Sequence, residues 1–211
     1  MNYNFITIEG NIGAGKTSLA TRIAEQFNGK LILEQFEENA FLPKFYKDPE
    51  KYAFPLELSF LAARYHQLKQ EITSGDLFKS FTISDYFIAK SLIFASKTLQ
   101  DDEYELYKKL FSIINTTLPK PDLLVYLYLN TKNLKRNISK RGREYEKDID
   151  EAYLQKIQSA YLHYIEKLHD SVVLIVDTNK IDFVNNGGDY EKILELISRK
   201  YNSGVYRFNI E

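Results

Sequence analysis

The chain contains no cysteine and no tryptophan, and among its 211 residues there are only one methionine and three histidines. Without cysteine it can form neither a disulfide framework nor a thiolate zinc site. The histidines, His66, His163 and His169, are too scattered in the sequence to indicate a metal cluster. The absence of cysteine is compatible with a reducing compartment.

Long hydrophobic runs and an excess of either charge are also absent. The longest apolar runs, such as LLVYLYL at residues 123–129, are too short to cross a bilayer. Glu9 lies within the first apolar stretch, where a signal peptide would not tolerate a charge. The net charge of −1 gives no general attraction to nucleic acid or anionic membranes. We therefore expect a cytoplasmic protein with neither kind of partner.

The residues that are present favour one globular α/β domain over residues 1–211. Hydrophobic residues make up 44% of the chain and charged residues 27%, which is typical of a globular protein. Compact β-rich segments predict five buried strands at residues 5–9, 30–33, 80–84, 123–129 and 172–176. Apolar spacing near 3.6 predicts helices at residues 17–27, 53–73, 87–96, 103–116, 133–141, 151–168 and 190–201. This alternation predicts a five-stranded parallel sheet with helices on both faces.

The segment EGNIGAGKTS, which begins at Glu9, carries the strongest functional signal. Gly10, Gly15, Lys16 and Thr17 match the P-loop pattern G-x-x-x-x-G-K-[ST] between a strand and a helix. Such a loop directs backbone N–H groups at phosphate oxygens, while the lysine reaches the β- and γ-phosphates and the hydroxyl binds magnesium. The expected nucleotide-binding residues are Gly10, Asn11, Ile12, Gly13, Ala14, Gly15, Lys16, Thr17 and Ser18. The alternative is a glycine-rich turn that binds nothing.

A P-loop alone does not distinguish a kinase from a GTPase or a motor ATPase. The segment DTNKIDF at residues 177–183 contains N-K-I-D, which is similar to the guanine-reading motif of GTPases. However, it follows the last expected strand, and the accompanying switch motif D-x-x-G is missing. The chain is therefore not expected to be a GTPase.

Five separated segments together resemble the deoxyribonucleoside kinase family, of the bacterial deoxyadenosine/deoxyguanosine kinase type. They are GNIGAGKTS, FYKDPEKYAF, LELSFLAARY, RGREYE and VDTNKIDF, in the order of the family and spread over most of the chain. The resemblance implies a three-layer P-loop fold similar to thymidylate kinase, with a helical lid at about residues 136–148. It also implies ATP with Mg²⁺ as phosphate donor and a homodimer, for which residues 54–65 and 87–99 could supply the surface.

The resemblance assigns roles in the acceptor half of the site. Glu34 corresponds to the carboxylate that takes the proton from the sugar 5′-hydroxyl, and Tyr46 and Glu146 to the pair that holds the 3′-hydroxyl. Arg141 and Arg143 correspond to lid arginines that close over the transferring phosphate, where bidentate donors suit phosphoryl oxygens. The simpler alternatives are a solvated glutamate at a strand end, a packing tyrosine and a basic solvated loop.

In the donor half, the resemblance makes Asp85 a catalytic acidic residue. It would support Mg²⁺ together with Thr17, directly or through water. The segment that follows the last expected strand corresponds to the loop around the adenine of ATP. Its expected nucleotide-binding residues are Asp177, Asn179, Asp182 and Phe183.

The chain departs from the family in the substrate-binding residues. Where the family has [DE]-R-S after the third strand, this chain has a tyrosine, Tyr86, in place of the arginine. The family's base-reading glutamine, arginine and aspartate correspond to Glu57, Arg64 and Ser91. Glu57 and Arg64 share one helix face, so a structural salt bridge is equally possible. A carboxylate at position 57 could accept from both N1–H and N2–H₂ of guanine, which favours deoxyguanosine.

Three functional interpretations follow. The first is ATP-dependent phosphorylation of a deoxynucleoside, with a purine preferred, in nucleotide salvage. The second is a kinase-like module that binds nucleotide with little or no catalysis, because three presumed acceptor residues depart from the family while the P-loop is intact. The third is another P-loop phosphotransferase, such as a nucleoside monophosphate kinase. Glu34 and Tyr46 argue against the third, because a monophosphate oxygen needs no base.

Overall fold

The computed structural model describes residues 1–35, 39–73, 76, 78–147 and 149–211. The strands are β1 (Phe5–Gly10), β2 (Lys30–Ile32), β3 (Thr82–Ser84), β4 (Leu123–Tyr128), β5 (Val172–Asp177) and β6 (Gly204–Asn209). The helices are α1 (Lys16–Phe27), α2 (Leu42–Lys47), α3 (Pro49–Thr73), α4 (Ala89–Thr98), α5 (Asp101–Asn115), α6 (Thr131–Arg141), α7 (Glu151–Ile165) and α8 (Gly187–Ser198), with a 3₁₀ turn, η1 (Glu144–Glu146). The strands and helices alternate as expected.

All the strands run parallel in one sheet, in the order β2-β3-β1-β4-β5-β6. The α/β fold with a parallel sheet is confirmed, but the sheet has six strands and the expected number of five was wrong. The additional strand, β6, pairs with β5 from Gly204 opposite Val172 to Asn209 opposite Asp177. Its residues alternate between half-buried and exposed. A search for continuous buried runs missed it, because an edge strand covered on one side has no such run.

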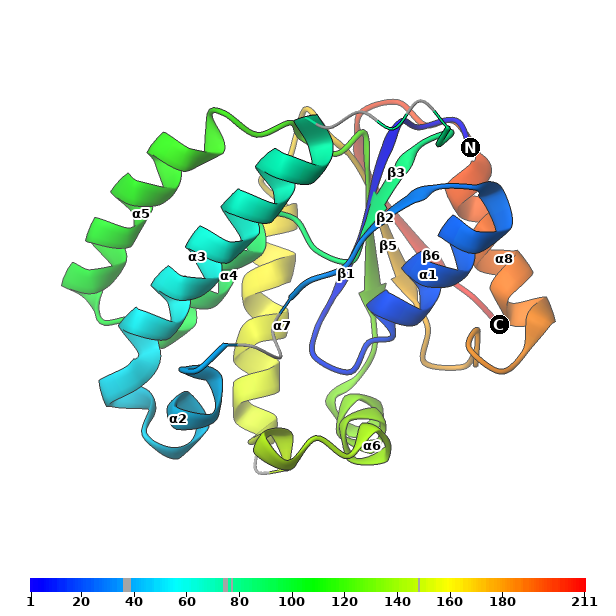
Figure 1. The fold of residues 1–211 in the computed structure, drawn as a ribbon. Coiled ribbons are helices and arrows are strands. Elements are labelled where there is room, and N and C mark those ends of the chain that lie inside the picture. The colour runs from blue at the N-terminus through cyan, green and yellow to red at the C-terminus, as the bar shows by residue number, and fades with distance from the viewer. Residues whose placement is uncertain (36–38, 74–75, 77, 148) are drawn as a thin grey trace.

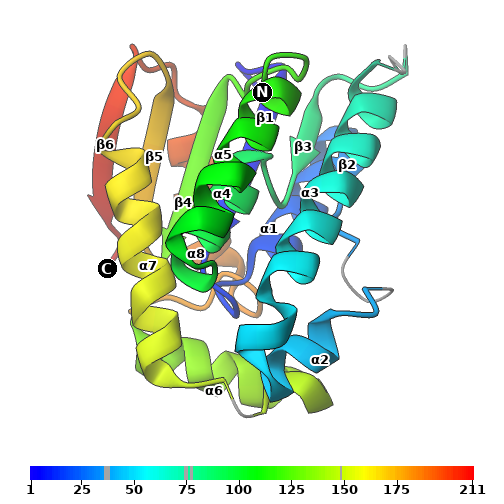
Figure 2. The ribbon, with the colours of Figure 1, turned by 90° about the vertical axis from the view of Figure 1, so that its left-hand side faces the viewer.

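Helices cover both faces of the sheet (Figures 1 and 2). On one face, α1 and α8 pack against strand residues such as Ile6, Ile8 and Leu174. On the other face, α3, α4, α5 and α7 pack against strand residues such as Tyr126 and Val173. Among the residues that the structure describes, none of the helices combines the length and the apolar character needed to traverse a bilayer.

The strand order places the P-loop in the middle of the sheet. β2 and β3 lie on one side of β1, whereas β4, β5 and β6 lie on the other. In open parallel sheets the crevice at such a reversal, beyond the carboxyl ends of the strands, is the usual position for a ligand. The segments that follow β1, β2, β3 and β5 carry most of the residues singled out in the sequence.

Candidate active site

The P-loop links the end of β1 to the first residue of α1, and its glycines have no room for a side chain. Gly15 has a φ of 89°, and a Cβ there would lie 2.7 Å from Cζ of Phe183. Gly13 has a φ of 83°, and a Cβ there would lie 2.9 Å from the carbonyl oxygen of Leu134. Left-handed backbone and close neighbours both select glycine. The loop is therefore held between α6 and the segment that follows β5.

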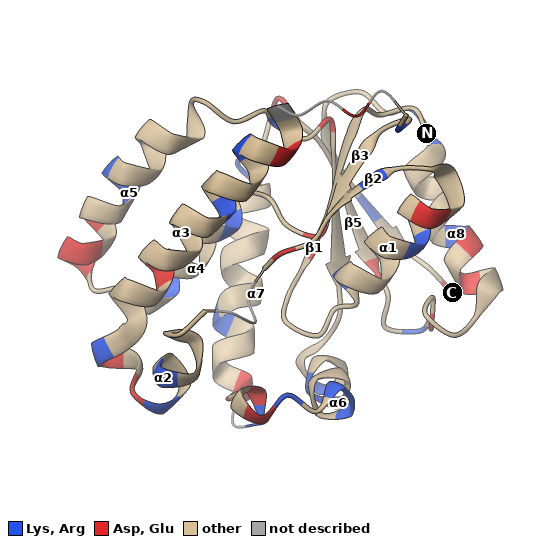
Figure 3. Ribbon diagram, viewed as in Figure 1, with Lys and Arg blue, Asp and Glu red and all other residues tan. Residues whose placement is uncertain are grey.

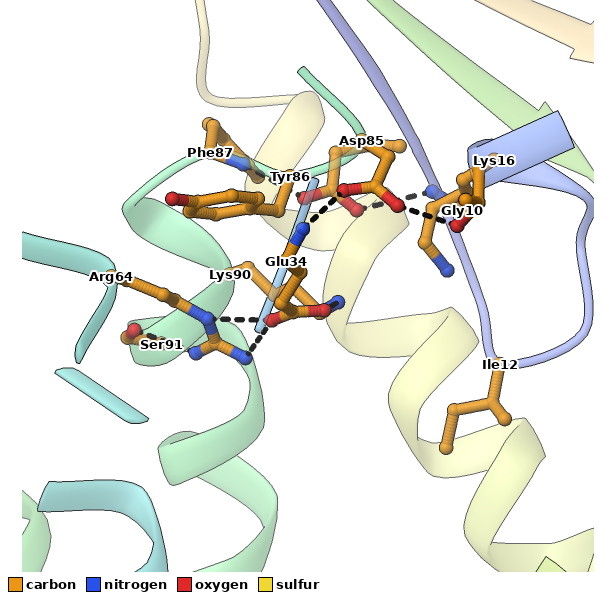
Figure 4. A network of polar contacts seen from close by, with 12 residues as sticks. Gly10, Ile12, Lys16, Glu34, Arg64, Asp85, Tyr86, Phe87, Lys90 and Ser91 are labelled. Carbon is orange, nitrogen blue, oxygen red and sulfur yellow. Dashed lines mark hydrogen bonds and ion pairs between the residues drawn. The ribbon is translucent and has the colours of Figure 1, made fainter. Parts of the chain in front are cut away.

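Lys16 and Thr17 begin α1 at the open end of this loop. The Lys16 ammonium donates to the carbonyl oxygen of Asn11 at 3.0 Å, and burial together with the Lys90 charge lowers its pKa to about 8. The Thr17 hydroxyl donates to one carboxylate oxygen of Asp85. The other Asp85 oxygen accepts the backbone N–H of Glu34 at 2.8 Å. Asp85 thus connects the P-loop helix to the segment after β2 (Figure 4).

The hydroxyl of Thr17 and the carboxylate of Asp85 are hard oxygen ligands of the kind that Mg²⁺ takes. Among the described residues, no group of three or more acidic, histidine or cysteine side chains could hold a metal ion. Magnesium bound with a nucleotide keeps several waters and phosphate oxygens as ligands, so one or two protein oxygens suffice. The residues present therefore fit a Mg²⁺–nucleotide complex.

A cavity of about 1370 Å³ opens beside the P-loop. It brings together many of the expected residues, because its lining includes the P-loop from Gly13 to Ser18, Glu34, Asp85, Arg141, Arg143, Asp182 and Phe183. Gln67, Arg136, Lys140 and Thr178 also line it. Several Lys and Arg residues lie in α6 and in the segment after it (Figure 3), and four of these basic residues, Arg136, Lys140, Arg141 and Arg143, line the cavity. Their charge makes the cavity suitable for a polyphosphate.

Glu34 lies at the junction between this cavity and the sheet, and two cations contact its carboxylate (Figure 4). Arg64 donates to Oε1 from Nε at 2.8 Å and lies 2.6 Å from it through Nη2. Lys90 forms a short ion pair with Oε2. These two charges outweigh the effect of burial and lower the pKa of Glu34 to about 2. Glu34 is therefore an ionised, fixed carboxylate and not a solvated strand-end residue.

The expected base-reading residues Glu57, Arg64 and Ser91 are buried next to Glu34 and are not part of the cavity lining. Glu57 is only 3% exposed, and its Oε1 accepts from the Thr98 hydroxyl at 3.0 Å. Burial raises its pKa to about 7, although the Arg64 charge acts in the opposite direction. Arg64 also donates from Nη1 to the Ser91 hydroxyl at 2.7 Å. The structure shows no ion pair between Glu57 and Arg64, so the salt bridge considered from the sequence is not formed.

Tyr86 does not extend into the cavity. Its side chain is fully buried in the apolar cluster between the sheet and α3, and its hydroxyl donates to Gln67 Oε1 at 2.6 Å. The Gln67 amide donates in turn to the carbonyl oxygen of Leu33 at 2.9 Å. Tyr86 is therefore a core residue, whose hydroxyl helps to fix the segment before Glu34.

The residues expected to form the lid gather around Glu146, which is 6% exposed. Arg141 donates to its Oε2 at 3.1 Å from Nε and 2.5 Å from Nη2. Arg143 lies 3.5 Å from Oε1. The ring of Tyr46 stacks on that of Tyr145, with centroids 6.2 Å apart. Tyr46 therefore lies close to the segment that carries Glu146, although the two residues are far apart in sequence. Residue 148, the expected end of the lid, lies outside the described residues.

The segment after β5 has two different parts. Asp182 and Phe183 line the cavity. By contrast, Asp177 accepts from the Asn179 backbone and side-chain N–H groups at 2.9 and 2.8 Å, and neither residue is part of that lining. Asn179 Oδ1 also accepts the backbone N–H of Asn130 at 3.0 Å. This pair fastens the segment to the start of α6.

Comparison with known proteins identifies a family to which the P-loop, the cavity and the residues around Glu34 belong. The family model described as deoxynucleoside kinase matches residues 6–201. The chain belongs to the deoxynucleoside kinase family. It is 42% identical to deoxyguanosine kinase of Bacillus subtilis (strain 168), over 90% of this chain and 93% of that protein. It is 32% identical to deoxyadenosine kinase of Dictyostelium discoideum, over 94% of this chain and 79% of that protein.

Solved structures support the same family. The structure of deoxyadenosine kinase from M. mycoides with the products dCMP and a flexible dCDP matches with a TM-score of 0.79 and 27% sequence identity. The match covers 92% of this chain and 98% of that chain. Membership of the family, predicted from the sequence motifs, is confirmed, and the protein is a phosphotransferase enzyme. The non-catalytic module and the nucleoside monophosphate kinase are not favoured.

Sequence reasoning missed three polar residues at the site of this deoxynucleoside kinase. Lys90 forms an ion pair with Glu34. Gln67 accepts a hydrogen bond from Tyr86 and donates one to the Leu33 carbonyl. The Asn137 amide donates to the Gly13 carbonyl at 2.9 Å. Only Lys90 had a sequence signal, because it is the one charged residue in the largely apolar stretch at residues 86–95. A lysine in a buried helix start needs a partner, which directs attention to a nearby carboxylate.

Proposed function

We propose that this enzyme transfers the γ-phosphoryl group of ATP, bound with Mg²⁺, to the 5′-hydroxyl of a purine deoxynucleoside, with deoxyguanosine preferred. The observation that carries the base preference is the buried carboxyl group of Glu57, on the same helix as Arg64. Relatives named deoxyguanosine kinase, from Bacillus subtilis at 42% identity and Lactobacillus acidophilus at 32%, support the assignment.

In the donor half, the P-loop N–H groups and Lys16 would hold the triphosphate. Thr17 and Asp85 would hold Mg²⁺, Asp85 directly or through water, and the ion neutralises phosphate charge when it is bound. Phe183 and Asp182 would contact the nucleotide directly, since both line the cavity. Asp177 and Asn179 would support that segment from behind, as their mutual hydrogen bonds indicate.

In the acceptor half, the 5′-hydroxyl oxygen would attack the γ-phosphorus while Glu34 orients the hydroxyl and takes its proton. The bond from the γ-phosphorus to the bridging oxygen breaks, and ADP leaves with that electron pair. Arg141 and Arg143 would turn from Glu146 toward the transferring phosphoryl group. Tyr46 and Glu146 would then hold the sugar 3′-hydroxyl, which favours deoxyribose.

The carboxylate of Glu57 favours binding of guanine because guanine presents hydrogen-bond donors to it. An ionised carboxylate accepts hydrogen bonds at both oxygens and donates none, whereas N1–H and N2–H₂ of guanine are adjacent donors. Binding guanine would satisfy a buried carboxylate whose described hydrogen-bond partner is Thr98 alone.

Deoxyadenosine is the second candidate, and the pKa of Glu57 is the observation that favours it. Because burial raises this pKa to about 7, a neutral carboxyl group coexists with the carboxylate near neutral pH. A neutral carboxyl offers one donor and one acceptor, which is the pattern that adenine requires. Relatives named deoxyadenosine kinase are consistent with this possibility.

The test is phosphorylation of the four deoxynucleosides by labelled ATP, with wild type and E57Q. We expect wild type to prefer deoxyguanosine, and E57Q to lose about 10–100-fold in kcat/KM for deoxyguanosine while retaining deoxyadenosine, because an amide must present a donor to guanine. Glu50, an exposed glutamate in the first turn of the same helix, provides the control E50Q, which should keep the wild-type preference. A wild-type preference for deoxycytidine or thymidine would contradict the proposal.

We also propose that the enzyme is a cytoplasmic homodimer. The apolar side chains of α3 and α4 include Leu58, which is 37% exposed, and such a surface could support association. Sedimentation equilibrium would test the dimer, and a monomer at micromolar concentration would refute it.

A further inference from the structure

The loop between β3 and α4 lacks the arginine that the family resemblance places at position 86. Tyr86 occupies that position, and its buried ring and its hydrogen bond to Gln67 direct it away from the cavity. A charge missing at the point of phosphoryl transfer is costly, because arginines there stabilise the transition state. The positive charge beside Glu34 therefore has to come from other side chains, of which Arg64 is one.

Lys90, in the first turn of α4, lies next to Glu34 (Figure 4). Its side chain is 8% exposed, and its ammonium contacts the Glu34 oxygen that Arg64 does not bind. The start of α4 is anchored, because the backbone N–H of Phe87 donates to Glu9 Oε1 at 3.1 Å and that of Lys90 to the Phe87 carbonyl at 3.1 Å. Lys90 is therefore held in position before substrate binds.

The Lys90 charge also acts on groups other than its ion-pair partner, Glu34. It influences the pKa values of Lys16 and Glu9 in addition to that of Glu34. The Lys90 charge therefore acts on Glu34, which marks the acceptor side, and on Lys16, which marks the donor side. The arginine that is absent would have served both the 5′-oxygen and the phosphates.

Fold stability gives no sufficient reason for this ion pair. Removing two charges from water costs several kcal/mol per ion, and apolar residues of similar volume usually stabilise a fold as well or better. Lys90 lies in an apolar helix start, with the Phe94 ring centroid 5.8 Å from its ammonium. A buried lysine at this place is better explained by the reaction than by packing.

We propose that Lys90 is a positioning residue that, together with Arg64, fixes the Glu34 carboxylate in a site that has no arginine at position 86. This inference rests on the proposed function, in which Glu34 receives the 5′-hydroxyl. Each carboxylate oxygen accepts more than one hydrogen bond, so Oε2 can bind both Lys90 and the hydroxyl. Lys90 and Arg64 hold one carboxylate oxygen each and so fix the orientation of the Glu34 carboxylate. The effect therefore falls on kcat and not on ATP binding.

The experiment compares K90M and K90R with wild type in steady-state kinetics for deoxyguanosine and ATP. We expect K90M to lower kcat about 10²-fold, which is the size of effect that follows loss of one preorganised charged partner, with the KM for ATP within about twofold of wild type. K90R keeps the charge and should recover at least tenfold of that loss. K97M removes an exposed lysine from the same helix and should behave as wild type.

A double-mutant cycle with E34Q separates this inference from the proposed function. If Lys90 acts through Glu34, K90M should lower kcat far less in the E34Q background than in wild type. If E34Q itself retains wild-type kcat, the role of Glu34 in the proposed function is wrong. If E34Q is impaired but K90M keeps wild-type kcat, or if the two losses add in full, the inference about Lys90 is overturned. ATP binding by each variant verifies folding, and K90Q, which removes the charge but keeps a polar side chain, provides the test if K90M does not fold.

Discussion

Glu57 and Ser91 differ in charge from the residues that the family resemblance places at these two positions, and the two differences are opposite in sign. A glutamate in place of glutamine adds a negative charge on α3, and a serine in place of aspartate removes one from α4. Arg64, which lies between them, binds the Ser91 hydroxyl without an ion pair and directs its Nε to Glu34. The proposed base pocket therefore keeps one carboxyl group, which lies on α3 instead of α4.

The titration of Glu57 predicts a pH-dependent choice between purines. Its pKa is raised to about 7, so the group gains its charge as pH rises from 6 to 8. The charges that influence it are Arg64 and Lys90, which lower the pKa, and Glu34, which raises it. Because guanine needs the carboxylate and adenine the neutral form, kcat/KM for deoxyguanosine should rise about tenfold over this range, and that for deoxyadenosine should fall.

The measurement is kcat/KM for both nucleosides at pH 6, 7 and 8, since this parameter reports ionisation of the free enzyme. E57Q has no carboxyl group to titrate at this position and should give a constant ratio between the two nucleosides. A wild-type ratio that stays constant, or that falls as pH rises, is incompatible with base reading by Glu57.

At the scale of elements, the P-loop packs closely against the segment after β5 at Gly15. A methyl group at this position would overlap the Phe183 ring, and the left-handed backbone adds strain. We therefore expect G15A to weaken ATP binding more than tenfold, as measured by calorimetric titration. Gly204 also has a positive φ, of 151°, but no atom lies within 3.8 Å of its hypothetical Cβ. G204A should thus bind ATP like wild type, and equal affinity of the two variants would refute the argument.

Elements differ in how far the sequence predicts them. The P-loop is a local pattern, so its position between β1 and α1 follows from spacing alone. The strand β6 and the short helix α2 were missed, because an edge strand and a six-residue helix carry weak periodic signals. The direction of Tyr86 and the partners of Arg64 depend on packing between α3 and the sheet, and a sequence without a fold does not contain that information. Lys90 was missed because its carboxylate partner is distant in sequence.

At the scale of the whole molecule, the sheet separates the site into two halves that meet at β1. Most of the proposed acceptor residues come from the segments after β2 and β3 and from α3, on one side of the P-loop. The proposed nucleotide segment and lid come from the chain after β4 and β5, on the other side, and Glu146 of the proposed acceptor pair also lies there. Phosphoryl transfer therefore needs both sides to hold their substrates at once, in line across the end of β1.

Asp85 joins these halves, since one of its oxygens accepts from Thr17 and the other from the Glu34 backbone. A Mg²⁺–nucleotide complex that draws on Asp85 would change the support of Glu34, and binding of the two substrates should be thermodynamically coupled. We expect calorimetry to give a several-fold change in deoxyguanosine affinity when a non-hydrolysable Mg²⁺–ATP analogue is present. D85A should remove the change, and identical wild-type affinities would disprove the coupling. Linkage requires the nucleoside to alter the affinity for the analogue by the same factor. The affinity of the enzyme for each substrate would therefore depend on whether the other is bound.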